Sequence, residues 1–127
     1  MNANAKKWLT ALESGEFAQS KGALRSEAQR YCCLGVACEL YRRETGNGSW
    51  SPVWPLTFRD GQGSSANASL PEGVKKWLGI RTHNASFFGY VGRHHSAISM
   101  NDNGCGFAEI AKTIREQAER VFYVEAS

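Results

Sequence analysis

Three kinds of side chain that together bind nucleotides occur in segments without strong helical periodicity or at helix edges. Ring faces come from Phe87, Phe88 and Tyr90, guanidinium groups from Arg25, Arg59, Arg81, Arg93 and Arg115, and directional polar groups from Asn101 and Asp102. A ring stacks on a base, a guanidinium pairs with phosphate, and an amide or carboxylate recognises base edges or ribose hydroxyls. The sequence therefore permits a site for a nucleotide-sized anion. Each residue alone also has an ordinary role, Phe87 or Phe88 in the core and an arginine on the surface.

Two of these arginines have positions that favour a role in a site. Arg25 follows Leu24 in a glycine-bearing loop, immediately before an apolar segment. Arg115 lies one residue past the apolar face that ends at Ile114, so we expect it at the edge of a buried stripe. From there its guanidinium would reach the rim of a pocket.

The cysteines and histidines offer two further chemistries, catalysis and zinc binding. The four cysteines are Cys32, Cys33, Cys38 and Cys105, and only Cys33 and Cys38 have the C-x2-4-C spacing, whereas a closed zinc site usually combines two such pairs. We predict reduced, buried thiols without a metal, and structural zinc with His83, His94 or His95 stays the alternative. Cys105 with a histidine would be a nucleophile and base, but no oxyanion-hole motif or third member accompanies them. We therefore do not expect an enzyme, and no cofactor motif is present.

Composition narrows the class of protein further. The chain has 127 residues, 42% of them hydrophobic and 21% charged, which is enough for one domain with a core, residues 1–127. No apolar run is long enough to cross a membrane, and the amino terminus leads directly into an amphipathic segment. We thus expect a cytoplasmic protein. A net charge of +3 suits a local anion pocket better than a track for duplex nucleic acid.

The elements that must position these residues follow from periodicity and turn signals. A first helix is predicted from about Asn4, as N-cap, to Ser14, with Trp8, Leu9 and Leu12 buried and Gly15 ending it. A polar loop over 16–30 precedes an almost wholly apolar core helix over 31–41. Two prolines make 50–60 an edge strand or hairpin arm, and the glycine- and serine-rich segment 61–69 is predicted to be a mobile loop.

The second half alternates helices with strand and turn. A short helix is predicted from Leu70-Pro71 to Leu78, strand and turn over 80–93, one helical turn over 96–100 and a polar loop over 101–106. The last helix, 107–120, repeats apolar residues at helical spacing, and Glu109 follows Gly106 at the spacing of a capping arrangement. The fold class is α+β, with about four helices packed around a small antiparallel sheet.

Three local patterns resemble a known family. They are Trp8-x-x-Ala11-Leu12-x-Ser14-Gly15, then Gly22-Ala-Leu-Arg25 with Tyr31-Cys-Cys-Leu-Gly-Val36-x-Cys38, and Met100-Asn101-Asp102 before Gly106-Phe107-x-Glu109-Ile110-Ala111, with Leu70-Pro71, Val74 and Trp77-Leu78-Gly79 between them. This arrangement, which covers most of the chain except Gly46–Ser69, resembles small bacteriophage and prophage proteins. It is most similar to the anti-Thoeris sponges, which bind and sequester cyclic ADP-ribose signals made by immune TIR enzymes.

The resemblance implies a homo-oligomer, a dimer or higher, that holds a cyclic nucleotide without cleaving it. In matching positions it implies Arg25 as a phosphate ligand, Asn101 as a reader of base or ribose, and Arg115 as a cover for the ligand. Phe88 or Tyr90 is the nearest candidate for the aromatic platform, and Arg59 for a further arginine. Gly106 departs from the hydroxyl residue expected there. Some members are also expected to take cyclic oligonucleotides at a second site.

Other functions stay open at this point. The main alternative is a small phage inhibitor that binds a host defence protein, such as an anti-CRISPR factor. An exposed apolar patch around Trp50, Trp54 and Phe58 would favour that alternative. A nucleic-acid-binding module, with strongly salt-dependent affinity, ranks next. An enzyme acting on a nucleotide ranks last.

Overall fold

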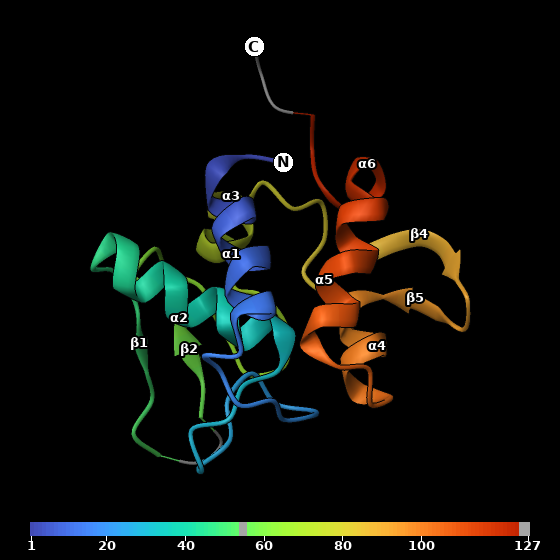
Figure 1. Ribbon diagram of the computed structural model, residues 1–127. Helices are drawn as coiled ribbons and strands as arrows, with labels where there is room; N and C mark the ends of the chain where they lie inside the picture. The colour runs from blue at the N-terminus through green and yellow to red at the C-terminus, as the bar shows by residue number, and fades with distance from the viewer. Residues whose placement is uncertain (54–55, 125–127) are drawn as a thin grey trace.

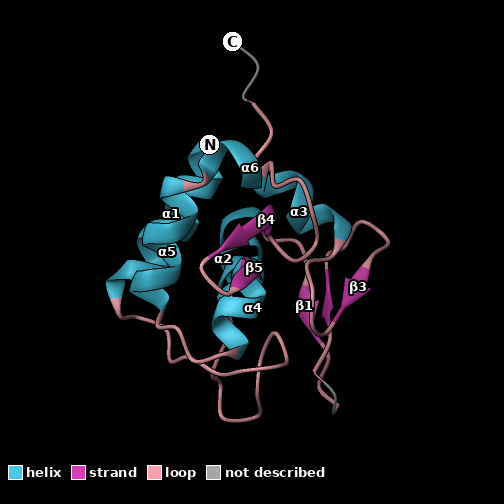
Figure 2. Ribbon diagram, turned by 90° about the vertical axis from the view of Figure 1, so that its right-hand side faces the viewer, coloured by secondary structure: helices cyan, strands magenta, loops and turns pink. Residues whose placement is uncertain are grey.

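A computed structural model describes residues 1–53 and 56–124 and confirms the mixed α+β class (Figure 1). The helices are α1 (Ala3–Ser14), α2 (Cys33–Thr45), α3 (Glu72–Leu78), α4 (Ala97–Asp102), α5 (Phe107–Glu116) and α6 (Ala118–Val121). One antiparallel sheet joins β1 (Ser49–Trp50), β2 (Phe58–Arg59) and β3 (Ser65–Ala66), with β2 in the middle. A separate hairpin joins β4 (Ser86–Val91) to β5 (His94–Ser96), so the strands form two small sheets rather than one. Figure 2 shows these sheets as separate ribbons.

The first helix buries the predicted apolar face but starts earlier than predicted. Trp8, Leu9 and Leu12 are buried, and Gly15 ends the helix in the left-handed conformation, as expected. The N-cap, however, is Asn2, whose Oδ1 accepts from the Ala5 N–H at 2.8 Å, so the prediction of Asn4 was wrong. The amide of Asn4 instead donates to the Trp77 carbonyl at 3.0 Å, which ties α1 to α3.

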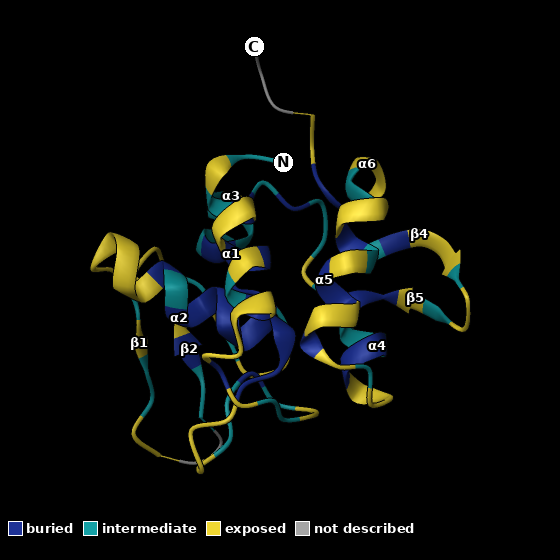
Figure 3. Cartoon of the chain, in the orientation of Figure 1, coloured by how far each residue is buried: buried dark blue, intermediate teal, exposed yellow. Residues whose placement is uncertain are grey.

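The apolar segment forms the central helix, α2, with its start moved to Cys33. Tyr31 precedes the helix and is extended, because its backbone bonds Ala18 and Ser20 of the preceding loop. Cys32 is the N-cap, and its Sγ accepts from the Gly35 N–H at 3.4 Å. A Cβ on Gly35 would lie 1.8 Å from the Leu24 carbonyl oxygen, so glycine is required where the loop crosses the helix. Figure 3 shows α2 buried over most of its length, with its carboxyl-terminal turn exposed.

The segment 50–60, predicted to be one edge strand or hairpin arm, instead turns back on itself, with strand only at its ends in β1 and β2, and β2 pairs further with β3. Phe58 is fully buried, whereas Trp54 and Pro55 lie outside the described residues. The glycine-rich segment 61–69 contains β3 and is closed by Asp60, whose carboxylate accepts the N–H groups of Gln62, Ser64 and Gly73 at 2.7–3.0 Å. Mobility of this segment stays a prediction.

Two predictions about the carboxyl-terminal third were wrong in detail. Asn101 and Asp102 are the last residues of α4, which follows its N-cap Ser96, and they are not part of a loop. The last helix is two helices, because Gln117 leaves helical geometry at φ −107° and separates α5 from α6. The predicted buried residues of α5, among them Ile110 and Ile114, are confirmed. None of the described helices is both long and apolar enough to cross a bilayer.

Candidate functional site

The guanidinium of Arg25 contacts two aromatic rings, whose centres are themselves 6.0 Å apart. Its Cζ is 5.7 Å from the ring centre of Tyr31 and 5.5 Å from that of Trp50, which are distances typical of cation–π contacts. Its Nε is buried and has no hydrogen-bond partner within residues 1–53 and 56–124. A buried donor without an acceptor is costly, but this atom is closed to solvent, so a ligand would meet the partly exposed remainder of the Arg25 side chain.

A cavity of about 360 Å³ adjoins this arginine. It is lined by Arg25, Glu27, Gln29, Trp50, Ser51, Pro52 and Leu56. The lining combines one cation, a flat indole, a carboxylate, an amide and a hydroxyl. These groups can contact the charge, the flat face and the polar edges of one small anion.

The loop that carries Arg25 is fixed at both of its ends. Arg25 forms an antiparallel bridge with Tyr31, and the backbone of Leu24 bonds Asn67 on one side and Cys32 on the other. Between them the chain turns back on itself, since the Ser26 N–H donates to the Arg30 carbonyl. The loop therefore presents Glu27 and the neighbouring polar residues at a set position.

The opposite wall, Trp50, is oriented by a buried carboxylate. Its indole N–H donates to Oε1 of Glu39 at 3.0 Å, and Glu39 is only 5% exposed. Arg42 donates to both oxygens of the same carboxylate at 2.8 and 2.7 Å, and Arg43 to Oε2 at 3.1 Å. Burial alone would raise the pKa of Glu39, but the hydrogen bonds from these donors lower it to about 2. Glu39 is thus ionised at neutral pH and fixes the indole ring.

The contacts around the cavity close into a ring. The Arg43 guanidinium lies 5.1 Å from the ring centre of Phe17, and Phe17 meets Tyr31 edge to face at 5.4 Å. Tyr31 then contacts Arg25 and Trp50, and Trp50 leads back through Glu39 to Arg43. We call this set the Arg25 cluster: Phe17, Arg25, Tyr31, Glu39, Arg43 and Trp50.

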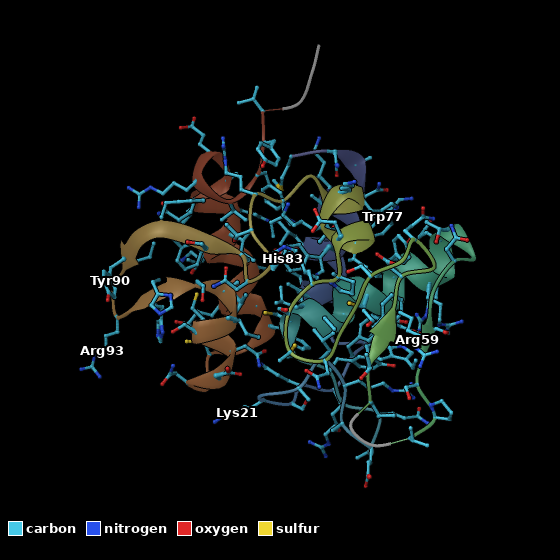
Figure 4. All side chains as sticks on the ribbon, turned by 180° about the vertical axis from the view of Figure 1, so that it is seen from behind. Lys21, Arg59, Trp77, His83, Tyr90 and Arg93 are labelled. Atoms are coloured by element: carbon cyan, nitrogen blue, oxygen red, sulfur yellow. The ribbon has the colours of Figure 1, made fainter. Side chains whose placement is uncertain are left out.

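The other predicted arginines and rings lie apart from this cluster. Arg59 is exposed on β2, beside a separate hollow of about 280 Å³ formed with Gly61, Gly63, Ser64 and Ser65. Phe88 and Tyr90 are 64% and 71% exposed on the β4–β5 hairpin. Figure 4 places Tyr90 and Arg59 on opposite sides of the molecule, so the structure does not join these residues in one pocket.

Asn101, the predicted reader of base or ribose, is fully buried and uses its amide inside the protein. Its Oδ1 accepts from the Cys33 N–H at 3.1 Å and from the Gln19 amide at 2.9 Å. Its Nδ2 donates to the Ser20 carbonyl at 2.7 Å. Asn101 therefore joins the loop over 16–30 to the start of α2, and this geometry leaves it no hydrogen-bonding group for a ligand.

Arg115, the predicted cover, is engaged in an ion pair. Its Nη2 and Nε donate to the Glu13 carboxylate at 2.7 and 3.2 Å, which connects α5 to α1. Hydrogen bonding to Arg115 is the largest cause of a lowered pKa of Glu13. The guanidinium lies on the partly exposed surface, where Arg115 lines a separate hollow of about 410 Å³ with Arg120 and not the cavity beside Arg25.

The structure also brings one cysteine and one histidine together. The Cys105 Sγ is 3.8 Å from Nε2 of His94, whose Nδ1 is 3.2 Å from the Ser99 hydroxyl. Burial, together with Glu109, raises the pKa of Cys105, so the thiol is protonated at neutral pH and is a weak nucleophile. Among the described residues, no three His, Cys, Asp or Glu side chains gather as a metal site would require, and the four cysteines are free thiols.

A larger cavity, of about 450 Å³, lies beside α3. It is lined by Tyr41, Gln62, Glu72, Gly73, Lys76 and Trp77. Several of its polar groups already have partners within the protein: the Tyr41 hydroxyl donates to the Asp60 carbonyl, and Glu72 contacts Lys75 and His83. We therefore place the candidate site at the Arg25 cluster, where a buried donor is left unpaired.

Sequence reasoning found Arg25 but missed the residues that surround it. Trp50 was assigned to a strand and to a possible exposed apolar patch, and Tyr31 only to the core helix. One signal was available, because Glu39 is a lone carboxylate in an otherwise apolar helical segment, and a buried charge requires partners. Which partners those are depends on the fold.

Comparisons with known proteins give one match. The family described as "Domain of unknown function (DUF8296)" matches residues 1–118. That range contains the whole Arg25 cluster. Searches of the curated proteins and of the solved structures find no match.

Proposed function

This chain belongs to the DUF8296 family, and we propose that it binds a cyclic nucleotide signal and sequesters it without cleaving it. The observation that carries the proposal is the guanidinium of Arg25, which contacts the rings of Tyr31 and Trp50 and lines a cavity of about 360 Å³. A phosphate would pair with this guanidinium, and the indole would supply a stacking surface.

The size of the cavity sets what one chain can hold. Its volume of about 360 Å³ lies at the lower end of small-molecule sites, which range over about 300–1,000 Å³. We propose that one chain encloses one nucleotide unit of the ligand. A second chain then covers the remainder, so the binding form is a homo-oligomer.

Sequestration needs affinity and copy number rather than a reactive group. The protonated thiol of Cys105 agrees with a protein that leaves its ligand intact. The ligand class we propose is a signal of the cyclic ADP-ribose type or a cyclic oligonucleotide, and the setting is anti-defence by a phage in the host cytoplasm. A preorganised pocket favours tight binding, because little order is lost when the ligand enters.

The alternative is an inhibitor that binds a host defence protein, for which an exposed apolar patch around Trp50, Trp54 and Phe58 was expected. Phe58 is fully buried and Trp50 is half-buried against the Arg25 cluster, while Trp54 lies outside the described residues. The exposed apolar patch that would favour this alternative is therefore not formed by Trp50 and Phe58.

Calorimetric titration tests the proposal. The purified protein is titrated with cyclic ADP-ribose isomers and with cyclic di- and trinucleotides, and the ligand released by heating is weighed by mass spectrometry. We expect saturable binding and release of unchanged ligand. An altered mass would show an enzyme, and the absence of binding to every ligand would reject the proposal in favour of a protein-targeting inhibitor.

Matched variants locate the binding site. Arg25→Ala should weaken binding by about tenfold or more, because it removes a charge-assisted hydrogen bond and one side of the stack. Arg25→Lys keeps the charge but loses the flat guanidinium, so its affinity should fall between those of the wild type and Arg25→Ala. Arg30→Ala removes the same charge from the same loop outside the cavity lining and should bind normally. Equal losses in Arg25→Ala and Arg30→Ala would place the ligand elsewhere.

A further inference from the structure

The β4–β5 hairpin presents aromatic rings to solvent on the side of the molecule away from Arg59. Phe88 is 64% exposed and Tyr90 is 71% exposed, although both have large apolar rings. Figure 1 shows the hairpin projecting from the helices, and Figure 4 shows Tyr90 and Arg93 at its end, away from the body of the protein. Two exposed rings within three residues of one hairpin offer a candidate binding surface.

The backbone holds one of these rings outward at a cost. Phe88 has φ +53°, a left-handed conformation that is strained for a residue with a bulky side chain. Its ring is not buried in return, so core packing does not offset the strain.

The one formal charge of the hairpin has the sign that attracts an anion. Residues 86–96 contain Arg93 and no lysine, aspartate or glutamate. Arg120 of α6 adds a guanidinium, whose Nη1 lies 3.9 Å from the Cβ position of Gly89. Glu119 on the same short helix is acidic, so the positive character comes mainly from the hairpin. In the part of the chain that the structure describes, neither Arg93 nor Arg120 forms an ion pair.

The hairpin carries two exposed rings and an arginine, and two kinds of partner would meet these groups differently. The centre of a protein–protein interface is depleted in charge, whereas Arg93 lies at the end of the hairpin with Tyr90. Single-stranded nucleic acid offers the complement, because its bases stack on exposed rings and its phosphates pair with arginine. The register of the hairpin shifts between Ser86 and Val91, so Phe88 and Tyr90 do not follow the regular alternation of a strand.

We propose that the β4–β5 hairpin binds single-stranded nucleic acid, with bases stacked on Phe88 and Tyr90 and phosphates bound by Arg93. Tyr90 is held for this role by His95, whose ring meets it edge to face at 6.0 Å. The site is separate from the Arg25 cluster, with which it shares no residue. A negative result for nucleic-acid binding at the hairpin would therefore leave the cyclic-nucleotide proposal unchanged, and the reverse also holds.

Fluorescence anisotropy with a labelled oligothymidylate of about 15 nucleotides at about 50 mM salt tests this proposal. The wild type should bind, and a duplex of equal length should bind at least fivefold more weakly because its bases are not free to stack. Tyr90→Ala should weaken binding about fivefold or more, while Tyr90→Phe keeps the ring and the affinity. If the wild type does not bind the single strand, or binds the duplex equally well, the proposal is wrong.

Two further variants separate stacking and pairing from general charge. Arg93→Ala should weaken binding and reduce the slope of log affinity against log salt by about 0.7, while Arg59→Ala removes the same charge on the other side and should change neither. Phe88→Gly should weaken binding and raise the melting temperature, because it removes both the ring and the strain. Equal effects of Arg93→Ala and Arg59→Ala would show non-specific attraction and overturn the proposal, as would full affinity in Phe88→Gly.

Discussion

The indole N–H of Trp50 donates a 3.0 Å hydrogen bond to Glu39, a carboxylate with only 5% of its surface exposed. Eleven positions separate the two residues, and the bond joins the central helix to the first strand of the small sheet. Through this bond, the Glu39 carboxylate fixes the orientation of the Trp50 indole, which forms one wall of the cavity beside Arg25.

The stability of the protein should fall in acid because of Glu39. The pKa of its carboxyl is about 2 in the folded protein against an ordinary value of 4.5, so the folded state binds the proton less readily than the unfolded state. The resulting stabilisation, about 3 kcal/mol, is complete above about pH 5 and is lost as the pH falls toward 2. Urea unfolding of the wild type and of Glu39→Gln should show this as a difference that shrinks across that range.

The matched control for this prediction lies on the same helix. Glu44→Gln removes an exposed carboxylate paired only with Lys7 at 3.2 Å, and we expect a change within about 0.5 kcal/mol. A difference between wild type and Glu39→Gln that stays constant from pH 7 to about pH 2 would contradict the assignment.

Asn101→Ala should destabilise the protein by about 3 kcal/mol. The change leaves the Cys33 N–H and the Ser20 carbonyl without their partner in a fully buried position. Asn103→Ala, which removes an exposed amide from the end of the same helix, should cost about 0.5 kcal/mol. Chemical denaturation measures both, and equal costs would show that Asn101 is not the link between loop and helix.

Gly35→Ala should cost about 3 kcal/mol or more, because a Cβ at this position would overlap the Leu24 carbonyl oxygen at 1.8 Å. The backbone would have to separate where it positions Arg25, so ligand affinity should fall with stability. Gly106→Ser is the contrasting variant, since the position has open space and φ −70° at the start of α5. We expect a gain of a few tenths of a kcal/mol from the new N-cap hydroxyl, measured by thermal unfolding. A tolerated Gly35→Ala would refute the close crossing.

Arg115→Ala should change stability only slightly and ligand binding not at all. The Arg115 and Glu13 side chains are 38% and 40% exposed, and such a pair contributes about 0.5 kcal/mol. A double-mutant cycle with Glu13→Ala measures that energy, and calorimetry measures the affinity. A tenfold loss of affinity in Arg115→Ala would return this residue to the binding site.

The sequence alone determined the apolar faces of the helices. Trp8, Leu9 and Leu12 of α1 and Ile110 and Ile114 of α5 are buried as their spacing predicts, because period and burial are linked within one element. The start of α1 was less certain. Asn2 and Asn4 are both of a residue type favoured at an N-cap. The amides of both donate to the carbonyl of Trp77, which lies more than seventy positions away in the sequence.

The tertiary structure alone decided which polar residues meet. The sequence predicted both Asn101 and Arg25 as ligand-binding residues. The fold buries the Asn101 amide against Cys33 and Ser20, whereas the Nε of Arg25 has no partner among the described residues. Arg25 reaches Trp50 only because the loop crosses α2 at Gly35 and the first strand returns beside it. Contacts between distant segments depend on how whole elements pack, and residue type and spacing within one segment carry no information about that packing.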